Sequence, residues 1–377
     1  MSGPGRNTGI GQYTFNLLTR LTEVAPDLGL VAYCGPGEPR PGWLPGEVEW
    51  RPARRGLHPK FAAIEARLFE LPALARADGL GLFHSTGIHV RPSFPPVPRL
   101  HCPVVATIHD LLPLTHYQGR LPLRLRLFYR WNLDRAASSA RVVTVSEHSR
   151  REIGQGLAID LDRVTVIPNG VEFPPNHERA PLEALGVISP YLLYAGSYEP
   201  RKNFAGALEA FGHLVAKGFP HRLVAIVERS SGHAPAIQAQ LARLRLEDRV
   251  LLLHSLADAD LRAVYTHAEV LMFPSLGEGF GFPPLQGAAC GVPVVASDLP
   301  VLREILDGAA EFADPTDPAA LAGAVERLLG DPERRSLLSG RGPDQARRFS
   351  VEDFVEKHAQ LYRAALESTR QPVAAPS

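Results

Sequence analysis

Short apolar runs alternate with amphipathic segments along most of this chain. Continuous apolar runs are typical of strands buried on both faces of a parallel sheet, and apolar residues three and four positions apart are typical of covering helices. Strands are expected at residues 28–34, 81–85, 103–108, 142–145, 164–171, 191–195, 223–227, 250–254, 271–273 and 292–296. Helices are expected at 13–21, 61–77, 121–131, 204–211, 258–267 and 317–328, with a last one from residue 350. The alternation predicts an α/β fold.

The stretch from residue 271 to 300 combines a strand, a glycine loop, a helix start and a second strand. Glu278 stands among three glycines, which let backbone amides approach a ligand closely. Pro283 suits the opening of a helix and Gly291 suits its end. The free N–H groups of a helix start favour a phosphate, and Glu278 can accept hydrogen bonds from hydroxyls. Both fit a sugar nucleotide, although an ordinary turn with a solvated Glu278 fits the spacing equally well.

Charged and imidazole side chains follow other predicted strands. Arg201 and Lys202 come after the strand at 191–195, where two cations can neutralise a departing diphosphate. His84 and His109 end strands of the first half, and open α/β sheets bind ligands at carboxyl ends. The alternatives are a solvated basic pair and two hydrogen-bonded core or surface histidines.

Two further segments have an ambiguous pattern. Gly9 and Gly11 precede an amphipathic run, which predicts a glycine loop feeding a helix, although Gly-x-Gly alone is a weak signal. The segment LPLRLRLFYRW at 121–131 carries three arginines among apolar residues. Such a helix can lie on an anionic membrane or receive a lipid-linked acceptor. The sequence favours the alternative, a surface helix whose arginine stems cover apolar surface.

Composition narrows the class of protein. A chain of 377 residues is long enough for two α/β domains, and its formal charge of zero gives no bias toward nucleic acid. Its three cysteines form no Cys-x-x-Cys pair, which predicts reduced thiols in the cytoplasm and no zinc site. No stretch is apolar enough to span a bilayer or to form a signal peptide. We therefore expect a cytoplasmic protein with at most a peripheral contact on the inner face of the cell membrane.

Several motifs resemble one known family. EGFGFPPLQGAACGVPVVAS, from Glu278 onward, resembles the signature of the family 4 glycosyltransferases of the GT-B fold. That signature has a second glutamate eight positions after the first, where this chain has Gln286. TGIGQYT, TIHDLLPLTHY, VTVSEHSRREI, VTVIPNGV and YAGSYEPRKN resemble further segments of the family.

The resemblance implies roles for particular residues. The residues with an implied catalytic role are Glu278, Lys202, Arg201 and His109. Those implied to bind the donor are Gly9, Gly11, Gly279, Phe280, Gly281 and Gln286. Asp110 and Ser146 are implied to lie on the acceptor side. The family uses neither a metal nor a cofactor.

The implied fold is GT-B, with two facing Rossmann-like domains, a deep cleft between them and a C-terminal crossover helix. The implied domains are an acceptor-side domain at 1–174, a nucleotide-sugar domain at 175–349, the crossover helix at 350–369 and a disordered tail at 370–377. The family's first strand has no counterpart before Gly9, and we hypothesise a start codon placed too far downstream.

The implied reaction is transfer of a hexose, with retained configuration, from a nucleotide-diphosphate sugar to a glycan or lipid-linked acceptor of the cell envelope. The chain resembles the bacterial mannosyltransferases of polysaccharide assembly, so GDP-mannose is the expected donor. Gln286, an unusual Glu228 and the lack of a first strand favour an alternative. That alternative is a degenerate, non-catalytic GT-B protein that binds a nucleotide or a partner enzyme.

Overall fold

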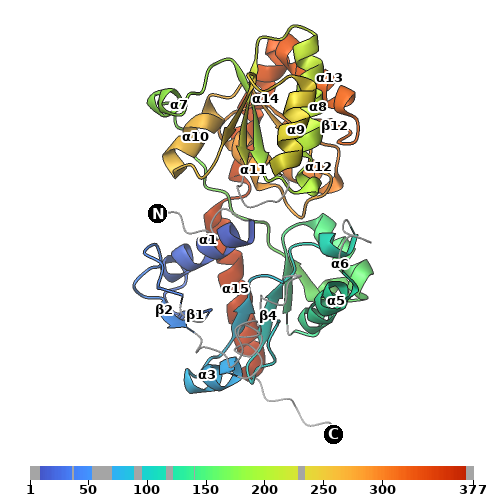
Figure 1. Ribbon diagram of the computed structural model, residues 1–377. Coiled ribbons are helices and arrows are strands. Elements are labelled where there is room, and N and C mark those ends of the chain that lie inside the picture. The colour runs from blue at the N-terminus through green and yellow to red at the C-terminus, as the bar shows by residue number, and fades with distance from the viewer. Residues whose placement is uncertain are drawn as a thin grey trace. The chain divides into compact units, whose positions relative to one another are not determined.

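The computed structural model describes residues 9–35, 38–52, 70–88, 96–115, 122–139, 141–227 and 234–370. The chain forms two compact units (Figure 1). Unit 1 combines Met1–Gly170 with Val351–Ser377, and unit 2 is Val171–Ser350. Each unit is an α/β structure around parallel strands.

Unit 2 contains a six-stranded sheet in the order β12-β11-β10-β7-β8-β9, with every neighbouring pair parallel. Its strands are β7 (Tyr191–Gly196), β8 (Arg222–Val227), β9 (Val250–Leu253), β10 (Val270–Phe273), β11 (Val294–Ser297) and β12 (Ala310–Ala313). The first strand, β7, lies in the middle of the sheet, and β8 and β9 follow it toward one edge. The strands β10, β11 and β12 extend from the other side of β7 toward the opposite edge. This is the Rossmann strand order, and β7 and β10 meet where the order reverses.

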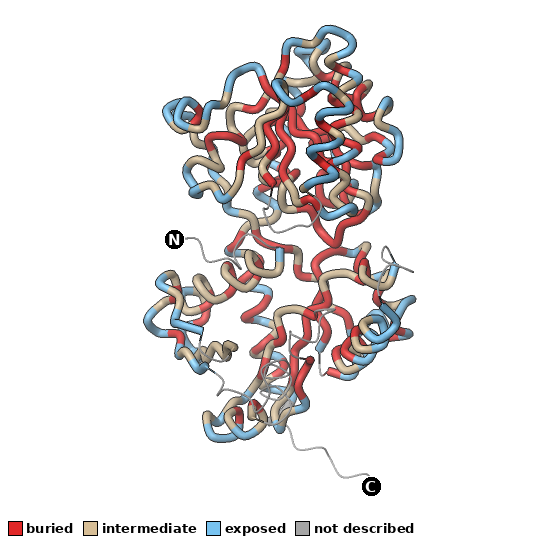
Figure 2. The backbone as a smooth tube through the Cα atoms, viewed as in Figure 1, coloured by how far each residue is buried: buried red, intermediate tan, exposed pale blue. Residues whose placement is uncertain are grey.

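Helices cover the sheet of unit 2. They are α7 (Ala180–Ala184), α8 (Phe204–Ala216), α9 (Ala234–Leu244), α10 (Asp258–Thr266), α11 (Phe282–Ala289), α12 (Pro300–Leu306), α13 (Pro318–Gly330) and α14 (Pro332–Arg347), with a 3-10 turn η3 (Pro200–Lys202). Helix α8 packs against α9 and α13, and α11 packs against α14 (Figure 1). The sheet is a buried centre enclosed by helices with exposed outer faces (Figure 2).

Sequence signals explain where several of these helices begin and end. As expected from the sequence, Asp317 begins α13, and its carboxylate accepts the amides of Ala319 and Ala320 at 2.9 and 3.0 Å. Prolines occupy the first turn of α11, and Gly291, with φ of 71°, follows its end, both as predicted.

Unit 1 contains a four-stranded parallel sheet in the order β3-β4-β5-β6 and a separate parallel pair, β1-β2. The strands are β1 (Val31–Cys34), β2 (Glu49–Pro52), β3 (Phe83–Ser85), β4 (Val104–Thr107), β5 (Arg141–Thr144) and β6 (Val164–Val166). The helices are α1 (Gly9–Val24), α3 (Leu71–Ala77), α4 (Leu112–Thr115), α5 (Leu123–Ala137), α6 (Glu147–Leu157) and α15 (Val351–Arg370), with a 3-10 turn η2 (Leu161–Arg163).

The last helix, α15, belongs to unit 1 and packs along α1. Its buried positions Val351, Phe354, Val355 and His358 follow the spacing i, i+3, i+4 and i+7, which places them on one face. The ring of Phe354 meets the ring of Tyr13 on α1 edge to face, with centroids 5.0 Å apart.

Some expectations differ from the structure or fall outside it. Gly9 and Gly11 lie within the first turn of α1, so the predicted glycine loop is instead helical from the first described residue. The predicted helix at 61–77 is described only from Glu70 onward. Residues 1–8, Glu228 and residues 371–377 lie outside the described part of the chain. No described helix combines the length and the apolarity needed to cross a bilayer.

Candidate functional site

The predicted catalytic residues of unit 2 come from the two strands that meet at the reversal of the sheet. Arg201 and Lys202 lie in η3, directly after β7, and Glu278 lies in the loop after β10. Open α/β sheets bind ligands outside the carboxyl ends of their strands at such a reversal. The topology therefore places these three residues at the usual ligand site of a doubly wound domain.

The side chains form a charge cluster around Glu278. Lys202 Nζ lies 2.7 Å from Oε1 of Glu278, and Arg201 Nη1 lies 3.0 Å from Oε2. The side chain of Glu278 is 7% exposed, and those of Lys202 and Arg201 are each 17% exposed. Two cations thus share one buried carboxylate, and each cation keeps part of its surface open to solvent.

The cluster perturbs the protonation of its members. Burial by itself would raise the pKa of the Glu278 carboxyl, but the charges of Lys202 and Arg201 and the hydrogen bonds from Lys202 and Ser275 lower that pKa to about 2. Burial lowers the pKa of Lys202, and the charge of Glu278 opposes that shift. Glu278 is therefore ionised at neutral pH, and it cannot serve as a proton donor there.

Backbone contacts hold the two strand ends together. The amide of Leu276 donates to the carbonyl of Arg201 at 2.7 Å, and Arg201 Nη1 donates to the carbonyl of Gly277 at 2.7 Å. Asn203, the first residue after η3, donates from Nδ2 to the carbonyl of Pro274 at 3.0 Å. These bonds fix η3 and the Arg201 guanidinium beside the loop after β10.

Ser275 is a member of the site that the sequence did not reveal. It is fully buried, and its hydroxyl donates to Oε1 of Glu278. The available signal was its position three residues before Glu278, but the sequence indicated only the end of a strand there. The hydroxyl fixes the orientation of the carboxylate that both cations share.

The start of α11 offers fewer free amides than the sequence suggested. Pro283 and Pro284 occupy the first turn and lack N–H groups, so they supply no donors at this end of the helix. Gly281 has φ of 120°, and a Cβ there would lie 2.7 Å from Leu302 Cδ2. A side chain at Gly281 would therefore crowd the start of α11.

Two predicted donor-binding residues have different surroundings. The ring of Phe280 is buried and meets the rings of Phe282 and Phe349 edge to face, so its side chain is a packing group. Gln286 is half-buried in the second turn of α11, and no described residue hydrogen-bonds to its side chain. Its amide keeps both donor and acceptor capacity for a ligand.

Unit 1 holds His109 two residues beyond β4. Its Nε2 lies 2.9 Å from the carbonyl of Thr86, which can only accept, so Nε2 carries the proton. Burial lowers the pKa of His109, so the ring is neutral at pH 7. Nδ1 has no hydrogen-bond partner among the described residues and is left as an acceptor.

The predicted acceptor-side residues have local structural bonds. Oδ1 of Asp110 accepts the amide of Leu112 at 3.0 Å, which shapes the turn into α4. Ser146 is fully buried, and its hydroxyl accepts the amide of Ser149 at 3.0 Å. Ser146 is thus the N-cap of α6, as its sequence position predicted.

His84 is a hydrogen-bonded core histidine. Its Nε2 lies 2.7 Å from the Thr107 hydroxyl, and its Nδ1 lies 2.5 Å from the hydroxyl of Tyr362 on α15. Both ring nitrogens are therefore occupied within unit 1. This is the alternative that the sequence left open beside a ligand role.

The same network continues to His358 on α15. The Thr107 hydroxyl lies 2.9 Å from the hydroxyl of Tyr13, which lies 2.6 Å from His358 Nε2. His358 Nδ1 lies 2.7 Å from the carbonyl of Phe354 and must donate to it, so Nε2 accepts from Tyr13. A chain of neutral groups thus ties the last helix to α1 and β4.

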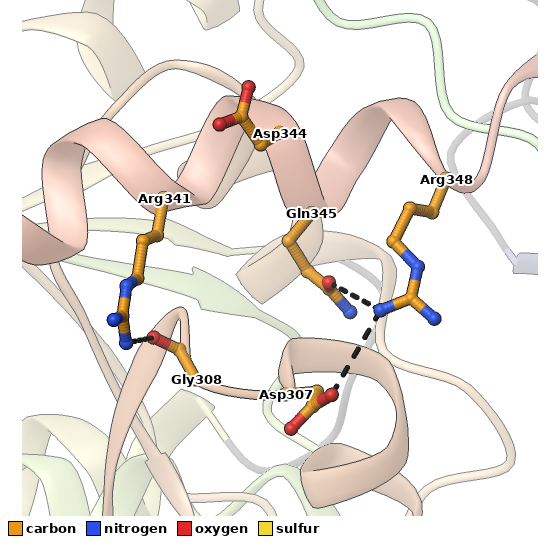
Figure 3. Close-up of a pocket in the computed structure, with 6 residues that line it drawn as sticks. All are labelled: Asp307, Gly308, Arg341, Asp344, Gln345 and Arg348. Atoms are coloured by element: carbon orange, nitrogen blue, oxygen red, sulfur yellow. Dashed lines mark hydrogen bonds and ion pairs between the residues drawn. The ribbon is translucent and has the colours of Figure 1, made fainter.

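A surface hollow in unit 2 lies at the end of α12 and along α14 (Figure 3). Its lining residues are Asp307, Gly308, Arg341, Asp344, Gln345 and Arg348. Arg348 lies 3.9 Å from Asp307 and bonds Gln345 at 3.0 Å, so the hollow is already crossed by internal polar contacts. It contains none of the predicted site residues.

Within the described ranges, no cluster of three His, Cys, Asp or Glu side chains is arranged to hold a metal.

Comparison with known families accounts for both units. The model of the Glycosyltransferase Family 4 matches residues 7–173, and that of the Glycosyl transferases group 1 matches residues 185–345. Together they span most of the chain. The chain belongs to this family of glycosyltransferases. The predicted family is thus confirmed, and the protein is a hexosyltransferase.

Individual relatives of this glycosyltransferase agree with the two family models. O-antigen chain mannosyltransferase B from Escherichia coli is 31% identical over 269 residues, which cover 69% of this chain and 70% of that protein. Sucrose-phosphate synthase from Thermosynechococcus elongatus has a TM-score of 0.76 at 20% identity, over 96% of this chain and 94% of the other. HepE from Anabaena, in complex with UDP-glucose, has a TM-score of 0.72 at 16% identity, over 97% of both chains. The expected GT-B fold of two Rossmann-like domains is confirmed.

Proposed function

We propose that this glycosyltransferase transfers a mannosyl group from GDP-mannose to a glycan or lipid-linked acceptor in the synthesis of a cell-envelope polysaccharide. The relative that is named a mannosyltransferase of O-antigen chains supports this choice of sugar and acceptor. The observation that carries the proposal is the cluster of Lys202, Arg201 and Glu278 at the reversal of the unit 2 sheet.

Lys202 and Arg201 would stabilise the departing diphosphate. Negative charge grows on the leaving group as the glycosidic bond breaks. Cations that are already held in place at a partly buried site stabilise such developing charge most strongly. Because two side chains supply this positive charge, we propose that the reaction needs no metal ion. Glu278 holds the two cations apart and accepts hydrogen bonds from donor hydroxyls.

We propose retention of configuration through displacement on the front face of the sugar. Glu278 is a poor nucleophile because its carboxylate is engaged by Lys202, Arg201 and Ser275. The bond from the anomeric carbon to the phosphate oxygen breaks, and a bond to the acceptor oxygen forms on the same face. The acceptor hydroxyl gives its proton to the departing phosphate. Nδ1 of His109 would accept a hydrogen bond from a hydroxyl of the donor sugar.

We place the enzyme in the cytoplasm, with its acceptor presented at the inner face of the cell membrane. The free thiols of Cys34, Cys102 and Cys290 support a reducing compartment. A lipid-linked acceptor would bring the enzyme to a membrane surface without any spanning segment.

Calorimetric titration against GDP, UDP and ADP and their hexose conjugates tests the proposal. We expect GDP-mannose to bind tightest and Lys202→Ala to weaken that binding, while Lys217→Ala, an exposed lysine paired with Glu326 on α13, leaves it unchanged. Preference for a UDP sugar would overturn the choice of donor. Lack of binding to every nucleotide would favour the degenerate, non-catalytic protein.

A further inference from the structure

Helix α5 turns an apolar stripe toward solvent. Leu123 is 67% exposed, Leu127 is 61% exposed and Trp131 is 42% exposed. The three recur at intervals of four, so they lie on one side of the helix over about 12 Å. Figure 2 colours several residues of this helix, which Figure 1 labels in unit 1, as exposed. We call these three residues the α5 stripe.

The exposed stripe supports the membrane interpretation of this segment. A helix whose arginine stems cover apolar surface would turn its leucines inward. The residues that α5 buries are instead Tyr129, Asn132, Leu133 and Ala136, mostly in its second half. The first half of the helix therefore projects Leu123 and Leu127 together with its arginines.

Arginines flank the stripe on both sides. At about 100° per residue, Arg124 lies beyond one edge of the α5 stripe and Arg130 and Arg126 lie beyond the other. Arg124 and Arg126 are exposed, and no described residue forms an ion pair with either. No acidic side chain occurs on α5 before Asp134, which pairs with Arg130 at 3.0 Å. The face is thus apolar along its middle and positive at both edges.

We propose that α5 is a docking surface for an anionic lipid bilayer, an inference that rests on the proposed function for its choice of a membrane as the partner. A helix lying in the plane of the interface buries its apolar side among acyl chains and sets its arginines at the level of the lipid phosphates. Trp131, at the end of the stripe, suits the boundary between the two because its ring is apolar and its N–H is polar. The charge pattern favours this partner over an apolar protein groove.

Flotation of the full chain with vesicles tests the surface. Vesicles of phosphatidylcholine alone are compared with an equal mixture of phosphatidylcholine and phosphatidylglycerol. We expect binding to the anionic vesicles only, weakened by salt because the attraction is electrostatic. The double variant Arg124→Gln/Arg126→Gln should bind about 25-fold more weakly, at about fivefold for each arginine near the surface. Leu123→Gln/Leu127→Gln should lose at least about tenfold through the lost apolar burial.

Matched controls keep the same chemical change elsewhere. Ile188→Gln/Leu337→Gln replaces two exposed apolar residues of unit 2, and Arg243→Gln/Arg347→Gln removes two exposed charges there. Both controls should float like the parent chain. Equal binding to neutral and anionic vesicles would overturn the proposal. So would an equal loss of vesicle binding in the α5 variants and in the control variants. Self-association that Leu123→Gln/Leu127→Gln abolishes, without vesicle binding, would assign the stripe to a second copy and overturn it too.

The vesicle assay contains no nucleotide sugar, and the donor titration contains no lipid. Lys202→Ala should therefore float like the parent chain, and Leu123→Gln/Leu127→Gln should bind the donor like the parent. A failure of the proposed donor would leave vesicle binding intact, and a failure of docking would leave donor binding intact, so the two are distinguishable.

Discussion

The ammonium group of Lys202 lies 2.7 Å from Oε1 of Glu278, a residue 76 positions further along the chain. The two side chains come from η3 and from the loop after β10, on either side of the strand reversal. With Arg201 on the other carboxylate oxygen, this pair gathers two cations around one buried carboxylate. In the proposed function, stabilisation of the leaving diphosphate depends on this contact.

Removing either partner should slow sugar transfer. We expect Lys202→Ala and Glu278→Ala each to lower the initial rate about a hundredfold, the usual order when one electrostatic contact to a transition state is lost. Lys217→Ala, which changes an exposed lysine directly after α8, is the control and should keep the parental rate. Circular dichroism of each variant would establish that it is folded, and unchanged rates in both site variants would refute the assignment.

Acid should weaken unit 2 through Glu278. The pKa of this carboxyl falls from its ordinary 4.5 to about 2, so the folded state holds the charged form more strongly than the unfolded state. The stabilisation is complete above pH 4.5 and is lost as the pH falls from 4.5 toward about 2. A shift of this size corresponds to about 3 kcal/mol of unfolding free energy.

Urea unfolding at a series of pH values measures this dependence. Glu278→Gln should show a shallower loss of stability in acid than the parent, while Glu326→Gln, which removes an exposed paired carboxylate, should follow the parent. Parallel curves for the parent and Glu278→Gln would contradict the prediction.

Gly281→Ala should strain the start of α11. A residue with a side chain rarely adopts φ of 120°, and the new Cβ would lie 2.7 Å from Leu302 Cδ2. We expect a loss of about 1–3 kcal/mol in unfolding free energy. Gly340→Ala is the matched control, because that glycine lies within α14 with open space around it. It should stabilise the chain by up to about 1 kcal/mol. Thermal unfolding of both variants measures these changes. Equal stability of Gly281→Ala and the parent would contradict the predicted strain.

Acid should also weaken unit 1 through His358. Burial is the main cause that lowers its pKa from 6.5 to about 4, so the unfolded state binds a proton first. Stability is therefore complete above pH 6.5 and falls as the pH drops from 6.5 toward about 4. His358→Gln should flatten the pH dependence of the unfolding free energy, and His177→Gln, an exposed histidine, should not. Identical slopes in the parent and His358→Gln would show that the ring is not held neutral.

The sequence by itself determined the elements and the family. Continuous apolar runs such as that of β10 indicated buried strands, because a strand covered on both faces has no polar side to show. Glycines and prolines around Glu278 indicated the loop and the helix after it. Glu278, Lys202 and His109 follow predicted strands, where open α/β sheets concentrate ligand contacts, and the family resemblance implied their roles.

Only the tertiary structure decided which of these groups meet. Strand order, which sets β7 beside β10, joins Lys202 to Glu278 and exposes the role of Ser275. His84 looked like a ligand group, yet Tyr362 of the distant helix α15 occupies its Nδ1. Which residues of α5 face solvent was decided by the elements that pack against that helix. Local pattern specifies the backbone of each element, whereas the partners of a side chain are set by residues far away in sequence, and these become neighbours only when the sheets assemble.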